Sequence, residues 1–93
     1  MTAPQISIDR AKIAAKAADE KLGKNIAVID VSNVMAITDV FVIVSADNER
    51  QVAAIVQEVE DDLTDEGVEP KRREGNRENR WVLLDYGNFV VHI

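Results

Sequence analysis

The sequence predicts a single α/β domain in which helices flank a mixed β-sheet. Two segments repeat their apolar residues at the three- and four-residue spacing of a helix. Short runs rich in β-branched residues, at 26–31, 40–44 and 81–93, are typical of strands. The last run contains a hairpin signal, which requires antiparallel neighbours. With a further strand in the charged segment 71–80, the predicted element order is αββαβββ.

Length and charge limit what this domain does. The 93 residues suffice for one hydrophobic core, so one domain is expected over 1–93. Seventeen acidic residues against 11 basic ones give a net charge of −6, which disfavours wrapping nucleic acid and favours a basic partner. The absence of cysteine and the single histidine, His92, exclude thiolate and multi-histidine metal sites. No targeting or membrane segment is recognisable, so we expect a cytoplasmic protein without membrane contact.

The first helix and the two strands after it are predicted from apolar patterning. The helix is expected to begin after a Ser7 cap and to stop at Gly23. Its narrow apolar stripe is mostly alanine: Ile8, Ala11, Ala15, Ala18 and Leu22. Segment 26–31 is almost continuously apolar, which predicts a strand covered on both faces, and 40–44 predicts a second buried strand.

The second helix has the clearest boundaries. Asn48 is a candidate cap, with Gln51 three residues later as in a capping box, and Gly67 ends the pattern. The predicted inner face consists of Val52, Ile55, Val56, Val59 and Leu63. The outer face carries the acids Glu58, Glu60, Asp61, Asp62, Asp65 and Glu66. An acidic run of this kind is typical of a solvated helix face.

A basic cluster follows the second helix and has two interpretations. Its members are Lys71, Arg72, Arg73, Arg77 and Arg80, with a turn expected at Gly75-Asn76. A groove for RNA phosphates is one interpretation, but such grooves interleave bases with aromatic residues, and here glutamates are interspersed instead. A charged edge strand that resists edge-to-edge pairing is the favoured interpretation.

The end of the chain predicts a hairpin with two different faces. Segments 81–86 and 89–93 are joined by Gly87-Asn88, a two-residue turn. Cross-strand pairing places Val82, Leu84, Tyr86, Phe89, Val91 and Ile93 on one apolar face, directed at the helices. The other face carries Trp81, Leu83, Asp85, Val90 and His92. This mixed face fits either a protein-binding hot spot or a second core layer under another helix.

Catalytic motifs are not found. There is no phosphate-binding loop, no dinucleotide fingerprint and no nucleophile elbow. Asp30 and Asp39 flank strands and could meet around a magnesium ion in a nucleotide-handling enzyme, although caps and turns are the commoner role of such residues. We therefore expect no enzyme activity and no cofactor, with that enzyme as an alternative and RNA binding through 71–80 as another.

Several blocks resemble the ribosomal silencing factor family, also called the Iojap-like family. They are segment 30–39 with Phe41-Val42-Ile43, Arg50-Gln51-Val52, Glu74-Gly75 and, most specifically, WVLLDYGNFVVH at 81–92. The resemblance spans roughly residues 8–93. It implies a mixed-sheet scaffold distantly similar to nucleotidyltransferases but without their catalytic site. It further implies binding to the fourteenth protein of the large ribosomal subunit, on the face that meets the small subunit. Subunit joining would then be blocked and translation repressed, with any rRNA contact peripheral.

The resemblance also selects the residues expected to contact the partner. Those residues are Trp81, Leu83, Asp85, Tyr86, Asn88 and His92. Family members usually carry an aspartate where this chain has Asn88, so one negative charge is missing at the turn. They also usually continue beyond the histidine strand with a tail that this sequence lacks. Apolar surface left exposed without that tail is expected to favour a homodimer.

Overall fold

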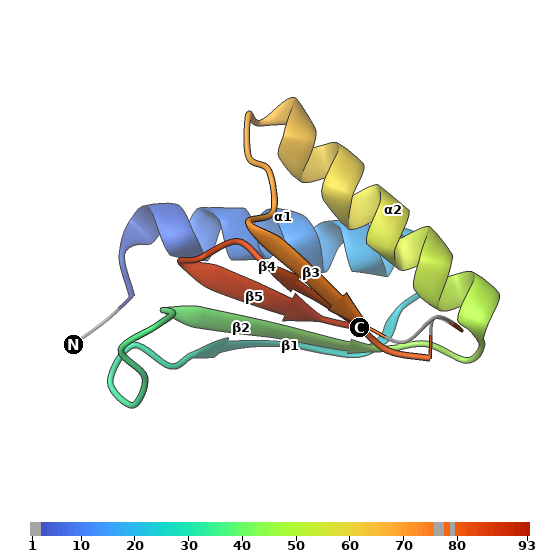
Figure 1. Cartoon of the computed structure of the whole chain (residues 1–93), viewed down its shortest axis with the longest axis horizontal. Coiled ribbons are helices and arrows are strands. Elements are labelled where there is room, and N and C mark those ends of the chain that lie inside the picture. Colours follow the sequence, from blue (N-terminus) through green and yellow to red (C-terminus); the bar gives the residue numbers. More distant parts are fainter. Residues whose placement is uncertain (1–2, 76–77, 79) are drawn as a thin grey trace.

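Both helices of the described chain lie on one face of a five-stranded sheet (Figure 1). The computed structural model describes residues 3–75, 78 and 80–93. The elements are α1 (Gln5–Glu20), β1 (Lys24–Asp30), β2 (Val40–Ser45), α2 (Glu49–Asp65), β3 (Arg72–Gly75), β4 (Val82–Asp85) and β5 (Phe89–His92). This order confirms the αββαβββ prediction.

The sheet is mixed, as predicted. Its strand order is β1-β2-β5-β4-β3, and β2 and β5 are parallel while the other neighbours are antiparallel. The parallel pair joins strands that are distant in the sequence, and it places the C-terminal hairpin beside β2. The core fills the space between the helices and one face of the sheet.

Helix α1 begins earlier than the sequence suggested. Its first residue follows Pro4, and no side chain caps it. Ser7 is fully buried inside the helix, and its hydroxyl donates to Oδ2 of Asp39 at 3.1 Å. The prediction of a Ser7 cap is therefore wrong, because the hydroxyl has a tertiary partner instead. Leu22 lies beyond the helix and is 75% exposed, so it does not extend the apolar stripe.

Close packing of α1 depends on small residues. Its buried positions are Ser7, Ala11, Ala14, Ala17 and Ala18. A Cβ atom on Gly23 would come within 2.6 Å of Val44 Cγ2 and 2.9 Å of the Ala18 carbonyl oxygen. Small side chains thus allow the close approach of α1 that the sequence indicated. The buried stripe differs from the predicted one, however, because Ala14 and Ala17 are buried while Ile8 and Ala15 are only half-buried.

Strand β1 is not covered on both faces. It lies at the edge of the sheet, and all its residues are exposed or half-buried. Its ladder with β2 is irregular between Lys24 and Ala27, where Asn25 has a φ of +53°. The apolar run 26–31 was misleading because an edge strand can be rich in apolar residues without being buried by helices.

Helix α2 confirms its predicted inner face and its cap. Val52, Ile55, Val56, Val59 and Leu63 are buried, and Gly67 follows the helix with a φ of +76°. Oδ1 of Asn48 accepts a hydrogen bond from the Gln51 N–H at 2.8 Å. The Gln51 side chain does not complete a capping box, since its Oε1 accepts from the Asp47 N–H at 2.6 Å. Its Nε2 donates to the Leu22 carbonyl at 2.9 Å, which joins the two helix ends.

Removing the Asn48 cap should destabilise the domain. Asn48→Ala leaves a backbone N–H of the first turn without its acceptor, so the free energy of unfolding should fall by about 1 kcal/mol in urea titrations. Asn48→Asp keeps an acceptor oxygen and should change stability far less. Equal losses in the two variants would contradict a capping role.

The last three strands follow the prediction closely. Strand β3 is exposed along its whole length at the second edge of the sheet, as the charged-edge interpretation requires. In the hairpin, Leu84 pairs with Val91, and the Tyr86 N–H donates to the Phe89 carbonyl at 3.0 Å. All six residues of its predicted inner face are at most 6% exposed. The expected turn at Gly75-Asn76 includes Asn76, which lies outside the described residues.

Candidate protein-binding surface

The sheet face opposite the helices forms one continuous surface, called the open face below. Residues paired across neighbouring strands share a face, so the ladders define two rows on it. One row is Ile29, Phe41, Val90, Asp85 and Arg72, and the other is Ala27, Ile43, His92, Leu83 and Glu74. The rows are apolar over β1 and β2 and become charged toward β3.

Trp81 extends the open face beyond the second row. Trp81 lies two residues before Leu83, so the two side chains are on the same face of the extended chain. Trp81 is 42% exposed. The indole meets the exposed His92 ring edge-on, with ring centroids 6.1 Å apart and an interplanar angle of 81°. The interpretation that these residues fill a second core layer under another helix is therefore wrong. Both rings stand at the surface, where a partner can contact them.

A small apolar hollow lies next to this ring pair. Its volume is about 130 Å³, and it is lined by Phe41, Val42, Ile43, Leu83, Val90 and His92. Phe41 and Ile43 come from β2 and were not among the expected contact residues. The alternation of VFVIV was the signal available for them, since it places these two side chains on the face opposite Val40, Val42 and Val44.

The six expected contact residues do not all share this surface. Trp81, Leu83, Asp85 and His92 lie on the open face, and Asn88 is exposed at the hairpin turn. Tyr86 lies on the opposite face, is 6% exposed and stacks on Phe89 with ring centroids 4.7 Å apart. Burial raises the pKa of its hydroxyl, and the charges of Glu60 and Glu69 raise it further. Tyr86 thus presents almost no surface to a partner in this conformation.

Asp85 is tied to its own chain. Oδ1 accepts a hydrogen bond from the Gly87 N–H at 2.8 Å, and Oδ2 lies 3.6 Å from Nη2 of Arg72. The Asp85 side chain is 27% exposed. Both carboxylate oxygens of Asp85 therefore already have partners within the chain.

The carboxylates of Asp30 and Asp39 act as local acceptors. Asp30 accepts from the Ser32 hydroxyl at 2.6 Å, from the Ser32 N–H at 2.9 Å and from the Ala3 N–H at 2.8 Å. These hydrogen bonds, led by the Ser32 hydroxyl, lower the pKa of Asp30. Asp39 accepts from Ser7. The arrangement supports the turn-and-cap role rather than a shared magnesium site.

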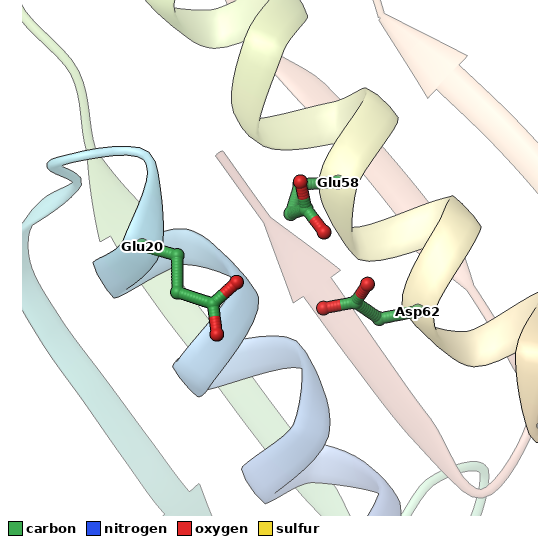
Figure 2. A group of neighbouring side chains, drawn as sticks. All are labelled: Glu20, Glu58 and Asp62. Atoms are coloured by element: carbon green, nitrogen blue, oxygen red, sulfur yellow. The ribbon is translucent and has the colours of Figure 1, made fainter.

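Three other acids come together between the helices. Glu20 on α1 faces Glu58 and Asp62 on α2, with one oxygen of each within 4.8 Å of the others (Figure 2). Among the described residues, this is the group that could hold a hard cation such as Mg²⁺ or Ca²⁺. Lys21 lies 3.6 Å from Glu58 and balances part of the charge. Glu58 and Asp62 are half-buried, so part of the expected solvated face is turned toward α1.

This acidic group should make stability depend on pH. A hydrogen bond with Asp62, followed by burial and the Asp62 charge, raises the pKa of Glu58 above 4.5. A raised folded-state pKa gives stability that is present below the unfolded-state pKa and lost as the pH rises through the folded-state value. Glu58→Gln should therefore raise the melting temperature at neutral pH, with a smaller effect in mild acid.

The matched control for that measurement is Glu69→Gln, which removes an exposed acid from the loop between α2 and β3, away from the helix end. Thermal unfolding followed by circular dichroism at several pH values compares the two. A Glu58→Gln variant whose stability follows the wild-type pH dependence would contradict the assignment.

The arginines of the basic cluster are paired with acids where the structure describes them. Arg72 lies 3.4 Å from Glu74, and Arg73 lies 3.2 Å from Glu60 on α2. Arg80 lies 3.2 Å from Glu78 and 3.6 Å from Glu49. Arg77 lies outside the described residues. Because neighbouring acids offset these charges, the cluster is a weaker attractor for phosphate than its composition suggests.

Fold and surface together define a small α/β domain with helices on one sheet face and an exposed, tryptophan-bearing apolar face on the other. The chain belongs to the ribosomal silencing factor family, because the family model described as "Ribosomal silencing factor during starvation" matches residues 4–93. In the described part of the chain, neither helix combines the length and the apolar character that a membrane crossing needs.

Individual relatives agree with this membership. The chain is 39% identical over 82 residues to the ribosomal silencing factor RsfS of Bacillus subtilis, covering 88% of this chain and 70% of that protein. It is 35% identical, with the same coverage, to RsfS of Halalkalibacterium halodurans. A crystal structure of a Chromobacterium violaceum protein is similar with a TM-score of 0.86 and 32% identity, covering 90% of this chain and 70% of that one. A Bacillus halodurans structure has a TM-score of 0.80 at 34% identity, covering 87% and 75%.

Proposed function

We propose that this protein binds the large ribosomal subunit through its open face and blocks joining of the small subunit, repressing translation in the cytoplasm. Its direct partner is the large-subunit protein that the family resemblance implies, the fourteenth, on the face that meets the small subunit. The observation that most strongly supports this proposal is the exposed Trp81–His92 pair beside the apolar hollow.

The composition of the open face supports a protein partner. Binding hot spots are enriched in tryptophan and in apolar residues that exclude water around it. Trp81 is 42% exposed, and Leu83, Val90 and Phe41 on the same face are half-buried in the free domain. Contact with a partner would remove this apolar area from water, which is favourable. The net charge of −6 favours approach to a basic ribosomal protein.

Steric exclusion supplies the mechanism. The molecule measures 37 × 26 × 23 Å, and a body of this size on the joining surface leaves no room for close contact between subunits. No bond is made or broken in this mechanism, and no cofactor is needed. The helical side, with its acidic residues, would face away from the large subunit.

Two other functions make different demands. Direct RNA binding through 71–80 requires a steep loss of affinity with salt, because each phosphate contact releases counterions. Nucleotide handling requires magnesium-dependent binding of a nucleoside triphosphate at Asp30 or Asp39. The ion pairs of the arginines and the local hydrogen bonds of both aspartates favour neither. A homodimer through the open face would compete with ribosome binding.

Co-sedimentation with purified large and small subunits tests the proposal. The protein should pellet with the large subunit and not with the small one. Naked rRNA and magnesium with nucleoside triphosphates serve as parallel arms, and light scattering at the assay concentration reports self-association. Binding to neither subunit, or binding of naked rRNA that is lost steeply as the salt concentration rises, would contradict the proposal.

A further inference from the structure

We infer that Asp85 is a positioning residue of the open face and does not pair with a cation of the partner. Its carboxylate fixes the hairpin turn, so that the contact surface is formed before binding. The expected effect on binding rests on the proposed function, whereas the role of Asp85 in the turn does not depend on it.

The first oxygen of Asp85 holds the turn. Oδ1 accepts from the Gly87 N–H two residues later, at 2.8 Å, which is the Asx-turn arrangement. Gly87 has a φ of +87°, a conformation that favours glycine. Without the acceptor, this turn would lose the hydrogen bond that holds the Gly87 N–H in place.

The second carboxylate oxygen and the backbone carbonyl of Asp85 both contact the chain at the start of β3. Oδ2 lies 3.6 Å from Arg72, and the Asp85 carbonyl accepts from the Lys71 N–H at 2.8 Å. The Lys71 side chain in turn covers the turn, since a Cβ atom on Gly87 would meet its Nζ at 2.8 Å and its Cε at 3.0 Å. Asp85 thus connects the turn with the segment that enters β3.

The position of the turn also determines where Asn88 and the first residues of β5 lie. The Asn88 carbonyl accepts from the Asp39 N–H at 2.9 Å, and β5 begins at the next residue. From there, β5 carries Val90 and His92 onto the open face. A displaced turn would therefore move Asn88 and the start of β5, where Val90 lines the apolar hollow.

Exposure argues against a direct ionic contact. The Asp85 side chain is 27% exposed, while that of Arg72, its partner, is 66% exposed. A cation from another protein would have to displace Arg72 or share the carboxylate with it. Pre-organisation of a surface improves affinity by lowering the ordering cost at binding, without adding a contact.

Three variants separate the two roles when their affinity for the large subunit is measured. Asp85→Asn keeps an acceptor oxygen for the Gly87 N–H but removes the charge, so its affinity should stay within about twofold of wild type. Asp85→Ala removes the acceptor and should weaken binding about fivefold or more. The control Arg73→Gln removes an ion pair of the same strand on the opposite side of the sheet, that with Glu60 on α2, and should stay within about twofold.

Rescue by asparagine is the deciding result. If Asp85→Asn weakens binding as much as Asp85→Ala, the charge itself contacts the partner and the inference is overturned. Unchanged affinity of a folded Asp85→Ala would overturn it as well. If Asp85→Ala does not fold, the affinity of Asp85→Asn relative to wild type still decides whether the charge contacts the partner.

Amide hydrogen exchange at Gly87, followed by NMR of the free protein, makes the test independent of the ribosome. Exchange should be similar in wild type and Asp85→Asn, and about tenfold faster in Asp85→Ala. Unchanged exchange in Asp85→Ala would overturn the role of Asp85 in the turn. If wild type fails to bind the large subunit, the proposed function fails, and this measurement still decides the positioning role.

Discussion

Trp81→Ala should cost at least about 2 kcal/mol of binding to the large subunit, which is roughly a 30-fold loss of affinity. The indole is the largest exposed side chain of the open face and the one in contact with the His92 ring. Its removal takes apolar area and an N–H donor from the surface without opening the core. Titration of labelled protein with large subunits gives the two dissociation constants.

The matched control for Trp81→Ala is Ile6→Ala. Ile6 is 52% exposed and lies on α1, on the opposite side of the sheet, so the change removes an exposed apolar side chain away from the open face. Its affinity should equal that of wild type. A Trp81→Ala protein with wild-type circular dichroism and undiminished affinity would show that another surface binds the subunit.

Phe89→Ala should cost about 3–5 kcal/mol of folding free energy. Phe89 is 1% exposed and stacks on Tyr86 across the hairpin, so truncation leaves a cavity in the core. Domains of this kind are stable by only about 5–15 kcal/mol, so the loss is a large fraction of the total. Chemical denaturation measures it.

Val90→Ala is the control for Phe89→Ala because the two residues are neighbours on β5. Val90 is half-buried on the open face, outside the core, and its truncation should cost much less. Similar losses in the two variants would contradict the assignment of Phe89 to the buried face.

Local signals predicted α2 and the hairpin well. Asn48, Gly67 and the spacing from Val52 to Leu63 all act within a few residues, and the two-residue turn fixes which hairpin residues share a face. That same alternation placed Tyr86 among the apolar residues directed at the helices, where the structure has it. Its selection as a contact came from the family resemblance instead.

Tertiary neighbours explain what the sequence did not predict. The apolar run of β1 does not show that the strand lies at an edge, and Ser7 resembles a cap until Asp39 is placed beside it. The part of the open face that β2 contributes depends on the parallel β2–β5 pair, whose strands are separated by all of α2. Phe41 and Ile43 could therefore not be joined to the hairpin residues from sequence spacing alone.

A subunit-joining assay shows whether the protein keeps the two ribosomal subunits apart. Large and small subunits are mixed in magnesium with increasing amounts of the protein, and the joined fraction is read from sedimentation profiles. Wild type should lower the joined fraction as it occupies the large subunit, while Trp81→Ala at the same concentration should do so far less. Wild-type protein that saturates the large subunit and leaves the joined fraction unchanged would contradict the proposed function.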